Sequence, residues 1–226
     1  MAASVSLTAL QTGLAEVDLL VAALPPPRPA SNAPIRRAVA RASVVMLSAH
    51  LERYVYGTNE EAVDYCNRCG VLSTYLPLAL RLTHTRFSLE PVVAASWEKR
   101  ADLLSGFVEQ DGWLWRPGSI GSLQASRILA WMKAPRPKEI QRHYENWGIP
   151  KIFDRITRTS NSRSRIWYAL DSLVTKRNAI AHGEWAETVS HQDIRGYRSA
   201  VIDFAERTDR AFARHLGRLC SSQAPW

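Results

Sequence analysis

The stretch IWYALDSLVTKRNAIAHG, residues 166–183, decides the fold class that this sequence predicts. Five residues recur along it at intervals of three, four or seven: Ile166, Leu170, Leu173, Val174 and Ala181. That spacing places them on one face of a helix. Gly183 suits the position just after a helix end, where the backbone often turns left-handed. We therefore expect a helix that buries one face and ends among polar residues.

The same spacing predicts helices elsewhere in the chain. Apolar residues three and four apart indicate a helix over residues 7–24 and a long one over 35–68, which Gly70 closes. Ser190 begins the last helix, with Asp193 placed as the acid of a capping box. Sustained alternation with period two, the mark of strands, is missing from the sequence. The predicted fold class is all-α.

The middle of the chain is expected to add shorter helices to the bundle. Pro91 fits the first turn of a helix that runs to about Gln110. Three apolar residues on it are expected in the core: Trp97, Leu104 and Phe107. Further short helices are expected over 123–133, 137–147 and 150–157. Residues 158–165, RTSNSRSR, are expected to form a polar, basic connector.

A proline-rich segment, Pro25 to Pro34, is the best candidate linker, because consecutive prolines stop a helix. It divides the chain into residues 1–34, a helix and linker, and 35–226, the main helical domain. The first helix is expected either to pack on the core or to reach another subunit. Glu16 and Asp18 interrupt its apolar run, which argues against a signal peptide or a membrane span. We expect a soluble cytoplasmic protein with no membrane partner.

Composition narrows the class of ligand. The formal net charge is +8 and the pI is about 9.8. A basic chain suits a polyanion, of which nucleic acid is the commonest, although a merely soluble basic protein has the same charge. Three cysteines make no disulfide framework, and Cys66 and Cys69 lack a second ligand pair for zinc. We expect neither a metal nor another cofactor.

Arg177, Asn178 and His182 are the best candidates for chemistry, because the usual nucleotide, zinc-protease and hydrolase motifs are missing. Arginine binds phosphate, and histidine exchanges a proton near neutral pH. Cleavage of RNA without a metal needs these two capabilities. Five residues along a helix turn about 140°, so Arg177 and His182 do not share a face. Either the helix end unwinds towards Gly183, or a second subunit completes the site, or both side chains only cap a helix end.

The run LVTKRNAIAHGE, residues 173–184, resembles the HEPN superfamily of all-α domains, whose signature is R-x4-6-H with a polar residue after the arginine. Within it the run is most similar to the RiboL-PSP-HEPN group, with the MAE-type HEPN group as a near alternative. SAHLERYVY, residues 48–56, resembles the upstream helix of that group and contains Glu52. The resemblance covers residues 35–219 in outline and is specific at 173–184.

The resemblance implies a metal-independent endoribonuclease that acts as a homodimer on RNA, with the R-x4-H helices meeting at a composite cleft. Arg177 would then stabilise the scissile phosphate, His182 would transfer protons, Asn178 would orient either group, and Glu52 would hold Arg177. We also expect RNA contacts from three basic residues: Lys176, Arg163 and Arg165.

The implied setting is the toxic effector of a toxin–antitoxin or phage-defence system. Such an effector needs a regulatory partner protein, such as an antitoxin, an ATPase or a guide-bearing sensor. The alternative is a HEPN module without catalysis that binds a nucleotide or a partner protein.

Overall fold

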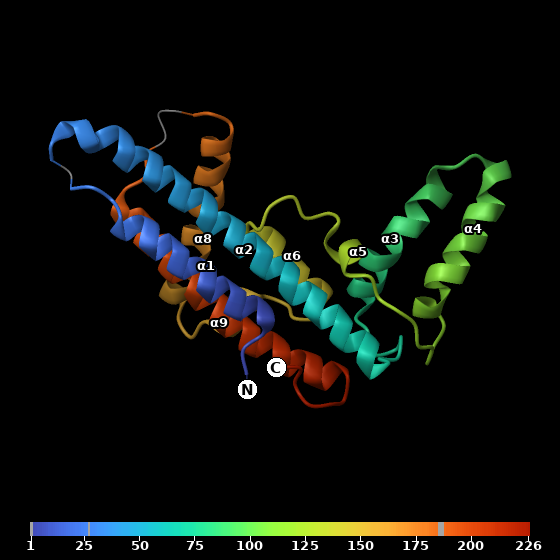
Figure 1. Cartoon of the computed structure of the whole chain (residues 1–226). Helices are drawn as coiled ribbons and strands as arrows, with labels where there is room; N and C mark the ends of the chain where they lie inside the picture. The colour runs from blue at the N-terminus through green and yellow to red at the C-terminus, as the bar shows by residue number, and fades with distance from the viewer. Residues whose placement is uncertain (1, 27, 185–187) are drawn as a thin grey trace.

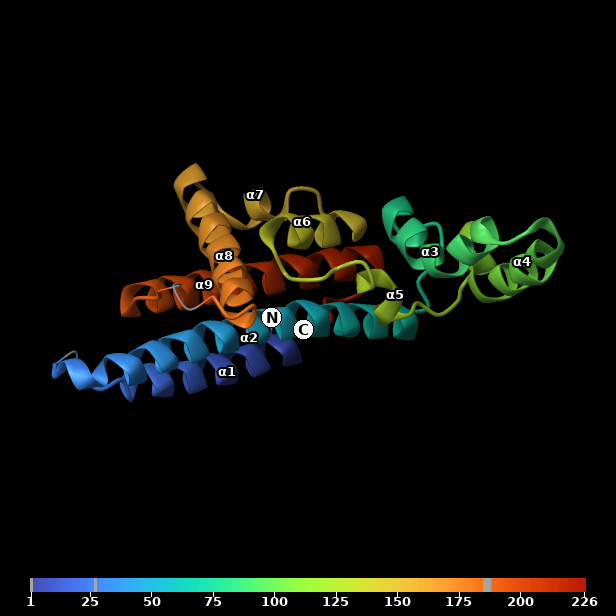
Figure 2. The same cartoon turned by 90° about the horizontal axis from the view of Figure 1, so that it is seen from above.

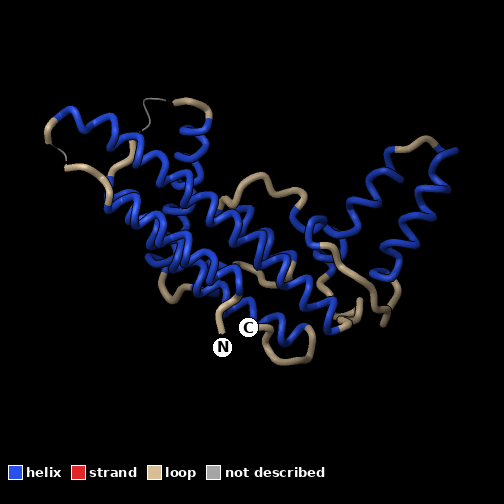
Figure 3. Tube along the Cα trace, in the orientation of Figure 1, coloured by secondary structure: helices blue, strands red, loops and turns tan. Residues whose placement is uncertain are grey.

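The computed structural model describes residues 2–26, 28–184 and 188–226, and within them every regular element is helical (Figure 3). The all-α prediction is confirmed. Four long helices form the bundle: α1 (Val5–Ala22), α2 (Ala33–Cys69), α8 (Ser160–Ala181) and α9 (His191–Leu219). The mid-region adds α3 (Leu78–Ala94), α4 (Trp97–Asp111), α5 (Ala125–Leu129), α6 (Pro137–Asn146) and α7 (Ile152–Ile156). Two short 3-10 turns complete the set, η1 (Ala30–Asn32) and η2 (Gly112–Trp115).

The bundle is built around α2, which contacts α1, α8 and α9 (Figure 1). Seen from above, α1 lies along α2, α9 runs beside them, and α8 crosses the layer that they form (Figure 2). Aromatic side chains fill the space between α2, α7 and α9. Phe204 of α9 stacks on Phe153 with ring centres 5.6 Å apart and meets the edge of Tyr54 at 6.3 Å. All three are buried, so this cluster anchors α9.

The first helix packs on the core of the same chain. Leu7, Leu10, Leu14 and Val17 are buried there, and two glycines allow the close approach of α1 to α2. A Cβ on Gly13 would lie 2.3 Å from the His50 ring, and one on Gly57 would lie 2.3 Å from the Ser6 hydroxyl oxygen. By length and composition alone, α1 would also suffice to cross a membrane.

Polar contacts fix the start of α1. The Glu61 carboxylate of α2 accepts hydrogen bonds from the backbone N–H groups of Val5 and Ser6, at 3.1 and 2.8 Å. These donors are among those that a helix leaves unpaired at its N-terminus. Ser4 also donates to Asp209 of α9, which brings the two ends of the chain together (Figure 1).

The prediction of a helix starting at Pro91 was wrong. Pro91 lies in the last turns of α3, and α4 begins only at Trp97, after Ser96. Pro91 has no N–H to donate to the carbonyl four residues earlier, and α3 ends three residues after it. The predicted core position of Trp97 was wrong as well, since the side chain is 79% exposed, and Leu104 is also exposed. Phe107 is only partly buried.

The predicted connector over residues 158–165 was wrong for most of its length. The Thr159 hydroxyl accepts a hydrogen bond from the backbone N–H of Ser162 at 3.2 Å, so α8 already begins at Ser160. Serine and threonine favour helix starts for this reason. Arg163 and Arg165 consequently lie on the first turns of the helix that ends at the R-x4-H motif.

Helices α3 and α4 pair with each other and stand away from the bundle (Figure 1). Nine large apolar side chains are exposed on these two helices: Leu78, Leu82, Phe87, Leu89, Val93, Trp97, Leu103, Leu104 and Val108. Exposed apolar surface that is contiguous marks interaction sites in soluble proteins. We call these two helices the apolar hairpin.

His143 of α6 gives the stability of the fold a specific pH dependence. Burial lowers the pKa of this fully buried ring to about 3. Unfolding exposes the ring, which then binds a proton below about pH 6.5, so stability decreases as the pH falls from there towards 3. We expect His143 to account for about 2 kcal/mol of lost stability between pH 7 and 5.

Urea unfolding at both pH values measures this loss. His143→Phe keeps an aromatic ring and removes the titrating group, so the difference should shrink by that amount. An unchanged difference would show that folding does not lower the pKa of His143.

Candidate functional site at the end of helix α8

The backbone closes the C-terminus of α8 without help from the candidate catalytic side chains. The Gly183 N–H donates to Ile180 at 3.1 Å, and the Glu184 N–H donates to Ala179 at 3.0 Å. Gly183 has a φ of 82°, which is the left-handed conformation expected after a helix. Together these bonds form a Schellman motif. The predicted role of Gly183 is confirmed.

Arg41 of α2 caps the same helix end from outside. Its guanidinium donates to the Glu184 carbonyl at 2.8 Å and, more weakly, to the Ile180 carbonyl at 3.5 Å. A cation suits this end of the helix dipole. In the part of the chain that is described, neither the Arg177 nor the His182 side chain donates a hydrogen bond to a helix-end carbonyl, and His182 is the C-cap residue through its backbone N–H.

Arg177 lies between α8 and α2. Its guanidinium is 3.9 Å from the carboxylate of Glu52 and donates a hydrogen bond to the Asn178 side-chain oxygen at 3.1 Å. The Arg177 and Glu52 side chains are 38% and 35% exposed. An ion pair this long and this exposed stabilises a fold by less than about 1 kcal/mol. The contacts orient the guanidinium while leaving it open to solvent.

His182 is the C-cap residue of α8 and its side chain is exposed. Its backbone N–H donates to Asn178 at 2.9 Å, which keeps the helix regular up to this point. Lys176, one turn earlier, donates to the Thr188 carbonyl at 3.0 Å and so lies beside the chain leading into α9. Side-chain contacts near this helix end thus join Arg177 to Asn178 and Glu52, while His182 lies five residues further along at the C-cap.

A pocket of about 900 Å³ adjoins Asn178 on the other side of α8. Asn178 shares this helix face with Asp171 and Thr175, which both bind Arg136. Four basic residues line the pocket: Lys133, Arg136, Lys138 and Arg142. Trp131 is also in its wall and lies 4.5 Å below the Arg142 guanidinium. Basic side chains beside an aromatic ring suit a nucleic-acid strand.

The sequence analysis missed these four basic residues as candidates. They occur within ten positions of one another, at residues 133–142, directly after Trp131. That cluster could have been recognised in the sequence as a candidate binding surface, but nothing in the sequence placed it next to Asn178. The contact depends on α6 packing against α8.

Arg163 and Arg165 do not join the motif. Arg163 pairs with Asp154, and Arg165 pairs with Asp203. Arg165 precedes Arg177 by twelve residues, which is about 18 Å along the helix axis. The structure therefore places these two arginines at the opposite end of α8 from His182.

A cluster of three or more potential metal-binding side chains does not occur among the described residues. Cys66 is buried, and its sulfur lies 3.8 Å from that of Cys220. Both thiols are free, as is Cys69. The hydrogen bond with Cys220, together with burial, raises the pKa of the Cys66 thiol, which keeps it protonated.

The fold and the helix end define a class of protein: an all-α domain that presents an R-x4-H motif at the solvent-exposed end of a long helix. Residues 127–214 match the family model RiboL-PSP-HEPN, which describes a HEPN superfamily domain. The match runs from α5 into α9 and includes Arg177, Asn178 and His182, while Glu52 lies outside it. No curated protein and no solved structure matches the chain.

Proposed function

We propose that this chain is a metal-independent endoribonuclease. HEPN domains are commonly RNA-cleaving, and the match spans the whole motif. The observation that carries the proposal is that the side chains of Arg177 and His182 donate no hydrogen bond that closes α8 in the described part of the chain, since Arg41 and the backbone do so. A phosphate-binding cation and an exposed proton carrier are thus held at one helix end, beside a basic pocket.

In the proposed reaction, the 2′-oxygen of a ribose attacks the adjacent phosphorus as a base removes its proton. The bond to the 5′-oxygen breaks, and that oxygen takes up a proton from an acid. The products are a 2′,3′-cyclic phosphate and a 5′-hydroxyl, so the proposed reaction requires neither water nor a metal ion. Arg177 stabilises the extra negative charge on the phosphorane. His182 supplies one of the two proton transfers.

The second proton transfer calls for a second histidine, which a homodimer provides by placing the His182 of each subunit at one cleft. Within one chain, Arg177 turns towards Glu52 of α2, whereas His182 projects from the end of α8. This divergence supports a composite site in which the arginine of one subunit acts with the histidine of the other.

A mixture of two inactive variants tests the composite site. Arg177→Ala and His182→Ala should each be inactive, but a heterodimer of the two contains one intact Arg177 and one intact His182 on different subunits. The heterodimer lacks one of the two His182 side chains, so if Arg177 acts with the His182 of the other subunit, the mixture should recover a measurable part of the wild-type rate, limited by the loss of one proton transfer. A mixture that forms heterodimers by mass spectrometry and remains inactive would contradict this arrangement.

The direct test of the function is incubation of the purified protein with total RNA in excess EDTA. We expect cleavage, with fragments ending in a 2′,3′-cyclic phosphate. Intact RNA across a range of salt concentrations would overturn the nuclease proposal. Activity that disappears on chelation and returns with a divalent cation would overturn the metal-free mechanism.

Glu52 is proposed to position Arg177. Glu52→Gln should lower cleavage about tenfold, since a small displacement of a catalytic group has a large effect on rate. The free energy of unfolding should change by less than about 1 kcal/mol, because the pair is long and exposed. Single-turnover kinetics and urea unfolding measure the two effects. Glu60→Gln, on the same helix, is the control, and an equal loss of activity in both variants would contradict the positioning role.

The proposed setting is a cytoplasmic effector, in a toxin–antitoxin or phage-defence system, under the control of a partner protein. The apolar hairpin supports such a partner, because a bound protein would cover its exposed apolar side chains. The hairpin also lies far from the helix end that bears the R-x4-H motif (Figure 1). The same observation favours the second candidate function, a HEPN module that acts by binding a protein. RNA that stays intact in the EDTA assay, together with a stable complex through the hairpin, would favour that function.

A further inference from the structure

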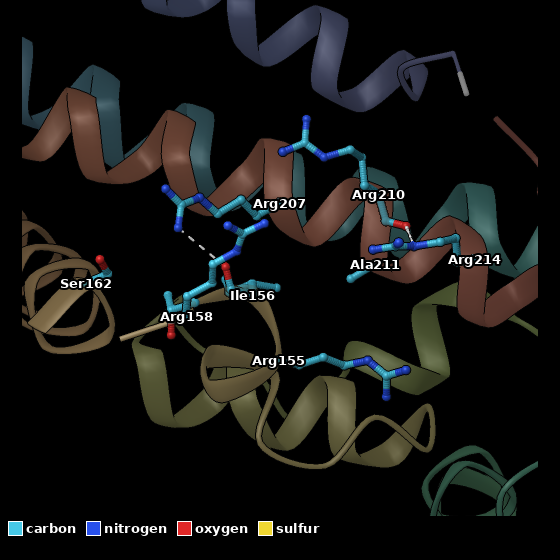
Figure 4. A pocket seen from close by; sticks show the side chains of 9 residues that line it. Arg155, Ile156, Arg158, Ser162, Arg207, Arg210, Ala211 and Arg214 are labelled. Atoms are coloured by element: carbon cyan, nitrogen blue, oxygen red, sulfur yellow. Dashed lines mark hydrogen bonds between the residues drawn. The ribbon is translucent and has the colours of Figure 1, made fainter. Parts of the chain in front are cut away.

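A second basic pocket lies between the start of α8 and the C-terminal half of α9 (Figure 4). It has a volume of about 570 Å³ and is open to solvent. Five arginines line it: Arg155, Arg158, Arg207, Arg210 and Arg214. The first two come from α7 and the link to α8, and the other three come from α9. The pocket is thus bounded by arginines from two separate parts of the chain.

None of the five guanidinium groups pairs with a carboxylate in the described residues. By contrast, the neighbouring Arg163 and Arg165 each form an ion pair with an aspartate. Arg207 donates to the Ile156 carbonyl at 3.4 Å, which ties the two walls of the pocket together. Like charges gathered without a counterion repel one another, and an anion relieves that repulsion.

The arrangement of the arginines points to a chain of phosphates. Arg207, Arg210 and Arg214 are spaced at i, i+3 and i+7, so they lie along one face of α9. The row spans about 10 Å of helix axis. A row of this length can contact more than one phosphate of the same strand. One isolated phosphate would occupy only two or three of the five guanidinium groups.

We propose that this pocket binds successive phosphates of an RNA strand at a distance from the cleavage site. The choice of RNA among polyanions rests on the proposed nuclease function. Ser162 lines the pocket and lies fifteen residues before Arg177, about 22 Å along α8. The pocket therefore holds a part of the strand several nucleotides away from the scissile bond. Phosphate contacts of this kind fix the register of a strand without reading its sequence.

The test measures binding in a His182→Ala background, so that cleavage does not interfere. The pocket variant is Arg158→Gln, Arg210→Gln and Arg214→Gln combined, all of them exposed residues. Arg207 is kept because of its bond to Ile156. The control variant removes the same charge elsewhere: Arg68→Gln, Lys99→Gln and Arg116→Gln, also exposed. Thermal unfolding of both variants shows whether they fold alike.

Fluorescence anisotropy with a short single-stranded RNA gives Kd between about 50 and 200 mM salt. The pocket variant should bind about tenfold more weakly or worse, and the slope of log K against log salt should decrease by about two. The control variant should change Kd by less than about twofold. Because this assay measures binding without cleavage, failure of the binding proposal can be distinguished from failure of the nuclease proposal.

Several outcomes would overturn the proposal. Equal weakening in both variants would mean that only net charge matters. RNA binding as tight as in the parent protein would mean that the pocket is not used by RNA. Inorganic phosphate, ATP or vesicles of anionic lipid that bind the parent protein but not the pocket variant, while RNA binds both equally, would assign the pocket to those ligands instead.

Discussion

His182→Ala is expected to lower RNA cleavage by a factor of about 10² to 10⁴, which is the usual contribution of a general acid or base. The fold should be unaffected. The His182 side chain is exposed, and the backbone hydrogen bonds that close α8 remain available to alanine. Substitutions at such positions change stability by about 0.5 kcal/mol or less. RNA affinity should also stay within about twofold, since phosphate contacts dominate it.

Single-turnover cleavage in EDTA measures this loss, and anisotropy with a non-cleavable RNA measures affinity. His191→Ala is the matched control, because His191 is also near the surface, at the start of α9. It should cleave RNA at the wild-type rate. Unchanged cleavage by His182→Ala would remove the chemical basis of the proposed function. A parallel loss in His191→Ala would mean that the effect is not specific to the motif.

Asp111→Ala is expected to destabilise the apolar hairpin by about 3–5 kcal/mol, the cost of removing one partner from a buried ionic network. Asp111 is 1% exposed and lies at the end of α4. Its carboxylate accepts a hydrogen bond from Arg127 at 2.8 Å and lies 3.1 Å from the Nδ1 of His84. The Nε2 of His84 accepts from the Gln124 N–H at 2.9 Å, so the proton sits on Nδ1.

Burial lowers the pKa of His84, which is consistent with a neutral ring in this network. Loss of the carboxylate therefore leaves the Arg127 guanidinium as the unpaired buried charge. Because α4 contacts mainly α3 and η2, the damage should stay local. The bundle of α1, α2, α8 and α9 should remain folded, and with it the helix end that bears His182.

Hydrogen exchange resolved by peptide separates the two regions. Protection should fall in α3 and α4 and persist in α8 and α9. Asp102→Ala, an exposed aspartate on α4, is the control and should behave as the wild type. Unchanged protection in the Asp111 variant would show that the network contributes little to the stability of α3 and α4. Loss of protection throughout the chain would show that the hairpin is part of one cooperative unit.

The sequence predicted the bundle well where a helix buries a regular apolar face. Val44, Leu47 and Leu51 of α2 are buried as their spacing indicated, and so are Ile194, Val201 and Phe204 of α9. Gly183 and the capping box of Ser190 and Asp193 were predictable as well, because they depend on neighbours in the sequence. Local patterns and local hydrogen bonds are what a sequence shows directly.

The apolar hairpin was misread for a physical reason. Leu104 and Trp97 have the spacing of core residues, and spacing does not tell whether another helix covers that face. The capping role of Arg41 was equally invisible, since it depends on α2 lying 139 residues away from Ile180 in the sequence. The arginine pocket needed α7 and α9 to be brought together. Contacts of this kind follow from the fold and not from any one segment.

Gly183 and Arg41 close α8, so the residues that stabilise this helix end are not the ones that are proposed to act on RNA. The residues proposed to act on RNA contribute little to the stability of the helix that bears them. Selection can therefore change Arg177 or His182 without unfolding the domain. A silenced copy would keep its shape, and with it the surfaces of the proposed dimer and of the proposed partner, and would compete with the active form. A single substitution can therefore turn this chain into an inhibitor of the active protein.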